Sequence, residues 1–323
     1  MKGLKIIATG RSLPSKSVTN DDLSKIVETS DEWIYTRTGI RSRYFCDEGE
    51  NSLTLSISAA KKALESSGIN KDDLGCIIVA TLSATYVTPS TACLIQRELE
   101  LPENIPALDI NAACSGFIYG LEVARGLLSG SNAKYGLVIG VEQLSRILDM
   151  EDRSTCVLFG DGAGAAIVET EENTLYESVL GTKGGHEISC PGVNNFDDGQ
   201  KSYVSMDGTA VFRFATSAIP KCIDMLQQKH PFSLDEVDHV VCHQANSRII
   251  DHVVKKLKAD PAKFYKDMDH LGNTSAASIP LALSEMDDAG MIKDGDTLLL
   301  VGFGSGLTWA GVLIKFQKAK KVS

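Results

Sequence analysis

Three side chains stand out because their types and settings suit nucleophilic catalysis, and the first of them is a cysteine. Cys114 lies in the stretch DINAACSGF, where an extended apolar run meets a segment of helical period and small residues flank the thiol. The first turn of a helix lowers the pKa of a thiol through the helix dipole, and its free N–H groups can hold an oxyanion. The residues alone leave a second interpretation open, in which Cys114 is a small buried side chain at a strand–helix crossing.

The other two side chains are a histidine and an asparagine. His243 follows an apolar strand-like run in VVCHQAN, and Asn273 lies in the turn-rich segment HLGNTSAASIP. Taken singly, His243 is better explained as a polar strand end, and Asn273 as a helix N-cap or turn residue. Their placement relative to Cys114 is what suggests a common site.

That placement follows from an internal duplication of the chain. Apolar strand-like runs alternate with helical ones, as in βαβ units. The run at 74–81 resembles the run at 237–244, and the run at 135–142 resembles the one at 296–303; the two pairs are separated by 163 and 161 residues. Offsets that agree so closely indicate a duplicated α/β unit with mostly buried sheets. We therefore predict an N-terminal half over 1–172 and a C-terminal half over 173–323.

The duplication aligns the segment that contains Cys114 with the one that contains Asn273. DINAACSGFIYGLEVARGLLSG precedes the strand of one half, and DHLGNTSAASIPLALSEMDDAG precedes the matching strand of the other. Sites in such folds lie outside the carboxyl ends of the strands. Cys114, His243 and Asn273 are therefore expected at one place. The glycine-rich run GFGSG leads into a strand-like segment, so we expect it to bring backbone close to a site or to another strand and not to cradle a phosphate.

Composition narrows the classes of function. The 323-residue chain has a net charge of −10, which argues against nucleic-acid binding. We predict a soluble, cytoplasmic protein, because we find neither a signal peptide nor an apolar run of membrane-spanning length. The eight cysteines form no CxxC pair and no zinc-like cluster with histidine, so we predict no metal site and no cofactor. An acidic partner would need a local basic patch, such as the segment SRIIDHVVKKLKAD.

Six motifs spread along the chain resemble those of a known family. In order along almost the whole chain, the sequence contains DEWIYTRTGIRSRY, AACSGF, FGDGAGAA, HQAN, GNTSAASIPLAL and GFGSGLTW. These motifs resemble β-ketoacyl-acyl carrier protein synthase III, the initiating condensing enzyme of fatty acid synthesis. The resemblance implies an α/β thiolase-like fold with duplicated βαβαβ halves in five layers, α-β-α-β-α.

The resemblance also implies a catalytic triad of Cys114, His243 and Asn273. Cys114 would take an acyl group from acyl-CoA, and malonyl-acyl carrier protein would then lose CO₂ and attack the acyl thioester to give a 3-oxoacyl-acyl carrier protein. Decarboxylation needs no carboxylate base, but it needs hydrogen-bond donors where enolate charge develops, which neutral His243 and Asn273 can supply. The N–H groups of Cys114 and Ser305 would hold the acyl oxyanion.

Further residues follow from the resemblance alone. Trp33 and Arg153 would sandwich the CoA adenine, Arg37 would lie near its phosphates, and Phe212 and Asn246 would line the pantetheine tunnel. The carrier protein, which is acidic, would bind a patch comprising Arg213, Arg248, Lys255 and Lys256. A homodimer is implied.

Two positions depart from the family pattern. Thr88, in TYVTPS, stands where acetyl-selective relatives carry a phenylalanine that closes the acyl pocket across a dimer interface. We therefore expect tolerance of branched or longer primers. Thr209 stands where a more polar or basic residue is common, which puts one CoA or carrier contact in doubt.

Several other classes of protein fit these residues less well. A degradative thiolase would have a second catalytic cysteine where Asn273 lies, an HMG-CoA synthase would need a glutamate base, and a plant-type polyketide synthase is usually longer. A condensing enzyme of secondary metabolism stays open on sequence alone. So do, outside this class, a papain-like acyl-CoA hydrolase and a non-catalytic binding protein of the same fold.

Overall fold

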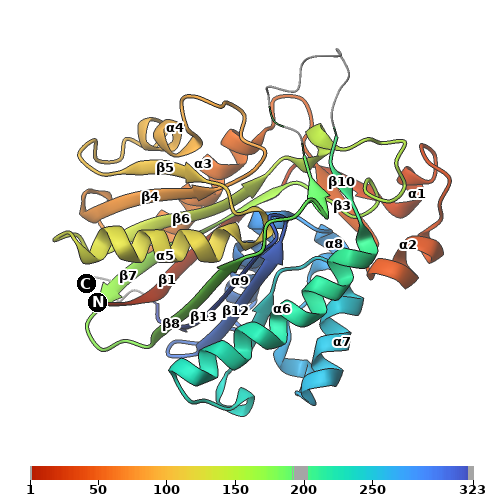
Figure 1. Cartoon of the computed structure of the whole chain (residues 1–323). Helices are drawn as coiled ribbons and strands as arrows, with labels where there is room; N and C mark the ends of the chain where they lie inside the picture. The colour runs from red at the N-terminus through yellow and green to blue at the C-terminus, as the bar shows by residue number, and fades with distance from the viewer. Residues whose placement is uncertain (1, 191, 193–202, 319–323) are drawn as a thin grey trace.

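The computed structural model describes residues 2–190, 192 and 203–318. Its main sheet has nine strands in the order β11-β12-β13-β1-β7-β6-β4-β5, with β8 paired to β13 (Figure 1). The first half of the chain contributes β1 (Gly3–Ser12), β4 (Leu74–Ala80), β5 (Ala107–Ile110), β6 (Tyr135–Glu142) and β7 (Gly162–Glu171). The second half contributes β8 (Tyr176–Thr182), β11 (His239–Cys242), β12 (Thr297–Gly304) and β13 (Thr308–Phe316).

The two halves of this sheet repeat one pairing pattern. In the first half, β1 is antiparallel to β7, β7 is antiparallel to β6, and β6 is parallel to β4. In the second half, β8, β13, β12 and β11 follow each other in the same way. The strands that the sequence matched, β4 with β11 and β6 with β12, hold corresponding places in the two patterns.

Helices divide the molecule into five layers, as the family resemblance implied. Among the residues that the structure describes, the half-sheets pair at one corner, through Lys5 with Lys315 and Ile6 with Phe316. Between them lie α5 (Gly116–Ser129) and α9 (Ser278–Asp288), whose apolar side chains share one core with strands of both halves. The outer layers are α3 (Ser52–Ser67) with α4 (Thr91–Glu98), and α6 (Gly208–Lys229) with α7 (Ser247–Leu257). Because both faces of each half-sheet are covered, runs such as LLLVG are apolar without alternation.

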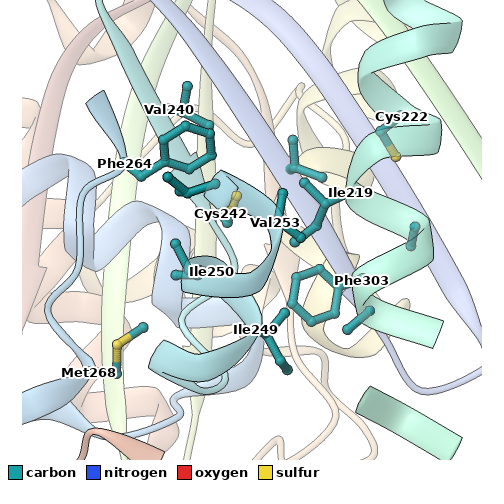
Figure 2. Close-up of a cluster of buried hydrophobic side chains, with 14 of the residues drawn as sticks. Ile219, Cys222, Val240, Cys242, Ile249, Ile250, Val253, Phe264, Met268 and Phe303 are labelled. Atoms are coloured by element: carbon teal, nitrogen blue, oxygen red, sulfur yellow. The ribbon is translucent and has the colours of Figure 1, made fainter. Parts of the chain in front are cut away.

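The outer core of the second half fixes the strand that precedes His243. Figure 2 shows side chains of α6 and α7 converging on Val240 and Cys242 of β11 and on Phe303 of β12. All three of these strand residues are at most 1% exposed. The end of β11, where His243 begins, is therefore held between a helical layer and the neighbouring strand.

The remaining elements surround the carboxyl ends of the strands. They are α1 (Asn20–Leu23), α2 (Asp31–Thr38), α8 (Met268–Leu271), the pair β2 (Lys16–Thr19) with β3 (Ser42–Phe45), and the pair β9 (Ile188–Ser189) with β10 (Ser205–Met206). None of the helices in the described part of the chain combines the length and apolar character needed to span a bilayer.

Candidate active site

Cys114 lies in a short 3-10 turn, Ala113–Ser115, between β5 and α5. Ala113 has a left-handed φ of +45°, and its N–H donates to Asn111 Oδ1 at 3.1 Å, which stabilises the turn. From the other half of the chain, Thr308 Oγ1 lies 3.1 Å from both the Ala112 carbonyl oxygen and Ser115 Oγ. The thiol is therefore held by contacts from both halves.

The glycine-rich run approaches Cys114, as the sequence predicted. A Cβ on Gly304 would lie 2.7 Å from Cys114 Cβ and 2.8 Å from its Sγ. Only glycine leaves room for the thiol there. Hydrogen bonding from the backbone N–H groups of Ser305 and of Cys114 itself lowers the pKa of the thiol, so both groups lie near the sulfur. The two donors expected for an oxyanion hole are therefore both close to the thiol.

The prediction of a lowered thiol pKa is wrong for this structure. Burial raises the pKa of Cys114 to about 11, opposed by a hydrogen bond from Ser275 and by the N–H groups named above, and reinforced by the charge of Glu142. The helix dipole acts on the thiol only from the start of the adjoining helix. The thiol is only 8% exposed, and loss of hydration disfavours the thiolate more strongly.

His243 directly follows β11 and is buried. Its backbone N–H donates to the Val301 carbonyl at 2.8 Å. Its ring stands edge-on to Phe303 with centroids 5.1 Å apart, and the ring atom Nδ1 lies 2.7 Å from Ser278 Oγ. Burial lowers the pKa of His243 to about 3. The imidazole is thus neutral at physiological pH, which is the form that can donate one hydrogen bond without carrying charge.

Asn273 lies in a turn that mirrors the Cys114 turn. Its Oδ1 accepts from Ser275 N at 2.9 Å, and Ser275 has a left-handed φ of +50°. Its backbone N–H donates to the Leu158 carbonyl at 2.9 Å. Because the oxygen of the amide is occupied by Ser275, the –NH₂ group is the part of Asn273 that can serve as donor to a bound molecule.

One cavity of about 270 Å³ joins these groups. Cys114, His243, Asn273 and Ser305 all line it. Its other walls are largely apolar and include Leu82, Leu144, Leu158, Phe159, Ile188, Val204 and Phe212. Such a cavity suits an acyl chain beside a few fixed polar groups. Across the described residues there is no cluster of three or more His, Cys, Asp or Glu side chains that could hold a metal ion.

The residues expected to bind CoA gather at and near this cavity. Arg37, Phe212 and Asn246 line it, and Asn246 Nδ2 donates to the Arg37 carbonyl at 3.0 Å. The guanidinium groups of Arg37 and Arg153 lie 4.5 and 4.6 Å from the centroid of the Trp33 ring. The Arg153 guanidinium therefore already contacts the Trp33 indole. An adenine that binds between Trp33 and Arg153 would have to displace the guanidinium from the ring.

The expected carrier-protein residues lie on neighbouring outer helices. Arg213 is on α6, and Arg248, Lys255 and Lys256 are on α7; all four are exposed. The two helices pack together, with the Phe212 and His252 rings 6.0 Å apart. No ion pair to a carboxylate involves these four cations within the described residues.

Two further expectations concern threonines. Thr88 is exposed and does not line the cavity of its own chain, so any effect on the acyl pocket would act in a second copy. Thr209 is exposed in the first turn of α6, where its N–H donates to Asp207 Oδ1 at 3.0 Å.

Sequence reasoning missed three polar residues beside the site. Glu142, at the end of β6, is fully buried and accepts hydrogen bonds from Ser83, from Leu82 N and from Ser275 Oγ at 3.3 Å. Ser278 contacts His243. Ser275 and Ser278 were visible in GNTSAAS, and Glu142 closes a strand already matched across the duplication. Only their three-dimensional contacts reveal their surroundings.

Comparisons with known proteins agree with this geometry. A model of the family described as 3-oxoacyl-[acyl-carrier-protein] synthase III matches residues 108–184, and the model of its C-terminal part matches residues 227–316. The β-ketoacyl-[acyl-carrier-protein] synthase III of Clostridium tetani is 46% identical, covering 98% of this chain and 99% of its own length. That of Clostridium botulinum is 47% identical, covering 97% and 99%.

Solved structures give the same fold. The 3-oxoacyl-[acyl-carrier-protein] synthase III of Aquifex aeolicus has a TM-score of 0.90 and 42% identity, covering 97% of this chain and 100% of its own. The priming β-ketosynthase of the R1128 polyketide pathway has a TM-score of 0.93 but 29% identity, covering 99% and 98%. The lower identity does not favour the secondary-metabolism alternative. The chain belongs to the β-ketoacyl-acyl carrier protein synthase III family, the condensing acyltransferases that initiate fatty acid synthesis.

Proposed function

We propose that Cys114, His243 and Asn273 carry out this condensation in two half-reactions. In the first, the Cys114 sulfur attacks the thioester carbonyl of an acyl-CoA, the bond to the CoA sulfur breaks, and the thiol proton ends on the departing CoA thiolate. The N–H groups of Cys114 and Ser305 stabilise the negative charge that develops on the carbonyl oxygen. Covalent catalysis divides a difficult condensation into two easier steps.

In the second half-reaction, malonyl-acyl carrier protein loses CO₂. The electrons of the broken C–C bond pass to the thioester as an enolate, whose oxygen is stabilised by His243 and Asn273. The enolate carbon attacks the acyl carbonyl, the bond to Cys114 breaks, and 3-oxoacyl-acyl carrier protein leaves; the thiolate regains a proton from water. A neutral histidine suits this role because it donates a hydrogen bond without exchanging a proton.

The observation that carries the proposal is the convergence of the three side chains and of Ser305 on one largely apolar cavity. Intact-protein mass spectrometry after mixing with acetyl-, isobutyryl- and octanoyl-CoA tests the first half-reaction. We expect one acyl adduct, absent in Cys114→Ser. We expect His243→Ala and Asn273→Ala to form the adduct but not to release it with malonyl-acyl carrier protein.

Other outcomes would overturn the proposal. An adduct that persists in Cys114→Ser would place the nucleophile elsewhere. An adduct that hydrolyses without malonyl-acyl carrier protein would indicate the hydrolase alternative. No adduct with any of the three donors would indicate a binding protein of this fold.

The CoA moiety is assigned to Trp33, Arg37, Arg153, Phe212 and Asn246. Support comes from their positions along and beside the cavity and from the arginine contacts to the Trp33 ring. Stacking on indole and guanidinium planes is favourable for an adenine. The carrier protein is assigned to Arg213, Arg248, Lys255 and Lys256, whose exposed charges offer a local positive surface on an acidic molecule.

We also assign the chain to a homodimer. Support comes from β5, which ends the sheet with no partner on its outer edge among the described residues, and from exposed Tyr86 and Val87 nearby. In such a dimer Thr88 would reach the partner's acyl pocket, and its small size predicts acceptance of branched or longer primers. Sedimentation at about twice 34.7 kDa is expected. The division into halves at 172/173 and the cytoplasmic location stay predictions.

A further inference from the structure

The ring of His243 has one polar partner that the proposed reaction does not use. Nδ1 lies 2.7 Å from Ser278 Oγ, and both side chains are 2% exposed. Ser278 is the first residue of α9, the central-layer helix that follows the Asn273 turn. Within the described residues this is the only hydrogen bond made by the ring, whereas the ring itself lines the cavity.

The surroundings of Ser278 indicate which way this hydrogen bond points. A hydroxyl has one proton to donate and two lone pairs that accept. Gln244 N lies 3.4 Å from Ser278 Oγ and can only donate to it. The described residues provide no other hydrogen-bond acceptor for the hydroxyl proton than Nδ1, so the hydroxyl donates to the ring. A neutral imidazole that accepts at Nδ1 carries its own proton on Nε2.

Gln244 and Phe303 help to hold His243 in this position. The Gln244 Nε2 donates to the carbonyls of Cys242 at 2.8 Å and of Tyr265 at 3.1 Å, which ties the two residues that flank His243 to each other and to the segment that contains Tyr265. Phe303 packs edge-on against the ring and limits its rotation. Backbone, ring face and Nδ1 are therefore each held by a different element.

We propose that Ser278 is a positioning residue that holds His243 in the Nε2–H tautomer, with that N–H available to the substrate. This deepens the proposed function and rests on it, because there His243 must donate a hydrogen bond to the malonyl thioester oxygen as it becomes an enolate. With the proton on Nδ1, Nε2 would present a lone pair to that oxygen and repel the developing charge. The acylation of Cys114 does not use this donor.

The tautomer can be measured directly in the protein, independently of activity. We would label the six histidines with ¹⁵N, record their ring resonances, and assign those of His243 from their loss in His243→Ala. We expect a protonated Nε2 and an unprotonated Nδ1 in the natural protein. In Ser278→Ala the proton is free to occupy either nitrogen, so the two ¹⁵N shifts should move toward each other.

The half-reactions give the second readout. A hydrogen-bond donor aimed at a developing oxyanion contributes roughly 10²–10³-fold to a rate, so loss of its orienting partner in Ser278→Ala should slow release of the acyl group by malonyl-acyl carrier protein about tenfold. Loading of Cys114 from acetyl-CoA should change less than about twofold. Ser284→Ala, which removes another buried hydroxyl from the same helix, is the matched control and should leave both the resonances and the rates unchanged.

The outcomes separate this inference from the proposed function. If His243→Ala still condenses at the natural rate, the proposed role of His243 is wrong whatever Ser278 does. If His243→Ala fails but the natural protein carries the proton on Nδ1, or if Ser278→Ala leaves the His243 resonances unmoved, the inference about Ser278 is overturned. Equal slowing of loading and condensation in Ser278→Ala would also overturn it, since that pattern indicates a general packing defect.

Discussion

The turn that contains Cys114 and the turn that contains Asn273 have nearly the same backbone but different chemistry. In each, an asparagine side chain, Asn111 or Asn273, accepts the N–H of the residue two positions on, which has a left-handed φ. In each, a 3-10 turn then leads into a central-layer helix. The residue after the left-handed one is Cys114 in one half and Ala276 in the other.

The turns differ in the strand that faces each of them. The Cys114 turn packs on β12 of the other half, which ends in Gly304. The Asn273 turn packs on β6, which ends in Glu142, and Ser275 donates to that carboxylate. One crossing therefore leaves space around a sulfur atom, and the other has a buried carboxylate at the equivalent strand end. A duplicated scaffold has thus been made asymmetric by a few side chains at equivalent places.

Moving the cysteine from one turn to the other is the strongest test of this asymmetry. We expect Cys114→Ala to lower condensing activity by roughly 10⁴-fold or more, as loss of a catalytic nucleophile does. Adding Ala276→Cys should not restore it, because Ala276 does not line the cavity. Intact mass and product formation are the measurements. Acylation of the thiol introduced by Ala276→Cys would show that the two turns are chemically interchangeable.

The electrostatic difference can be measured through the reactivity of the thiol. Burial raises the pKa of Cys114 to about 11. As long as the pH is below that value, each increase of one pH unit raises the thiolate fraction about tenfold. Iodoacetamide should therefore modify Cys114 about 10³ times faster at pH 10 than at pH 7, followed by peptide mass spectrometry. A rate that is already constant between pH 7 and pH 8 would instead support the helix-dipole expectation from the sequence.

The space beside the sulfur is tested at Gly304. Gly304→Ala would place a methyl group within 3 Å of Cys114 Cβ and Sγ. Displacing a reacting atom by about 1 Å can cost about 10²-fold in rate, and we expect a loss of that size in acyl loading. Gly126→Ala is the control, because that glycine lies in α5 with nothing within 4 Å of the added carbon. Equal activity of the two variants would contradict the need for space.

The buried carboxylate of Glu142, at the other crossing, should make the free energy of unfolding depend on pH. Burial raises the pKa of Glu142 to about 7, above its ordinary value of 4.5, so the folded protein holds a proton that the unfolded chain releases between these two values. The free energy of unfolding contributed by this group is therefore highest below pH 4.5 and falls as the pH rises through 7, by about 2 kcal/mol between pH 5 and pH 7.5.

Glu142→Gln should remove that dependence. The measurement is urea unfolding of the natural protein and of Glu142→Gln at pH 5 and pH 7.5. The contributions of the other titrating groups are the same in both proteins and cancel in the difference. The difference in free energy of unfolding between the natural protein and Glu142→Gln should shrink by about 2 kcal/mol as the pH falls from 7.5 to 5, because protonated Glu142 and Gln are both neutral. A difference independent of pH would mean that Glu142 stays ionised over this range.

Much of the fold and of the site was predictable because its signals are local. Apolar runs of strand length, separated by helical segments and repeated at a constant offset, predicted the matched strands β4 with β11 and β6 with β12. The glycine run before β13 predicted a close approach, and Gly304 makes one. Cys114 and His243 were placed together because each follows a strand whose carboxyl end lies at the same edge, and Asn273 because the duplication aligns its segment with that of Cys114.

What the sequence by itself determined is therefore the order of elements and the types of side chain at their ends. The tertiary structure alone decided how these side chains behave: the raised pKa of Cys114, the hydroxyl of Ser278 on His243, the carboxylate of Glu142 under Ser275, and the arginines on Trp33. The physical reason is that pKa values and hydrogen-bond directions depend on burial and on partners distant in sequence, whereas periodicity and turn chemistry depend on neighbours along the chain.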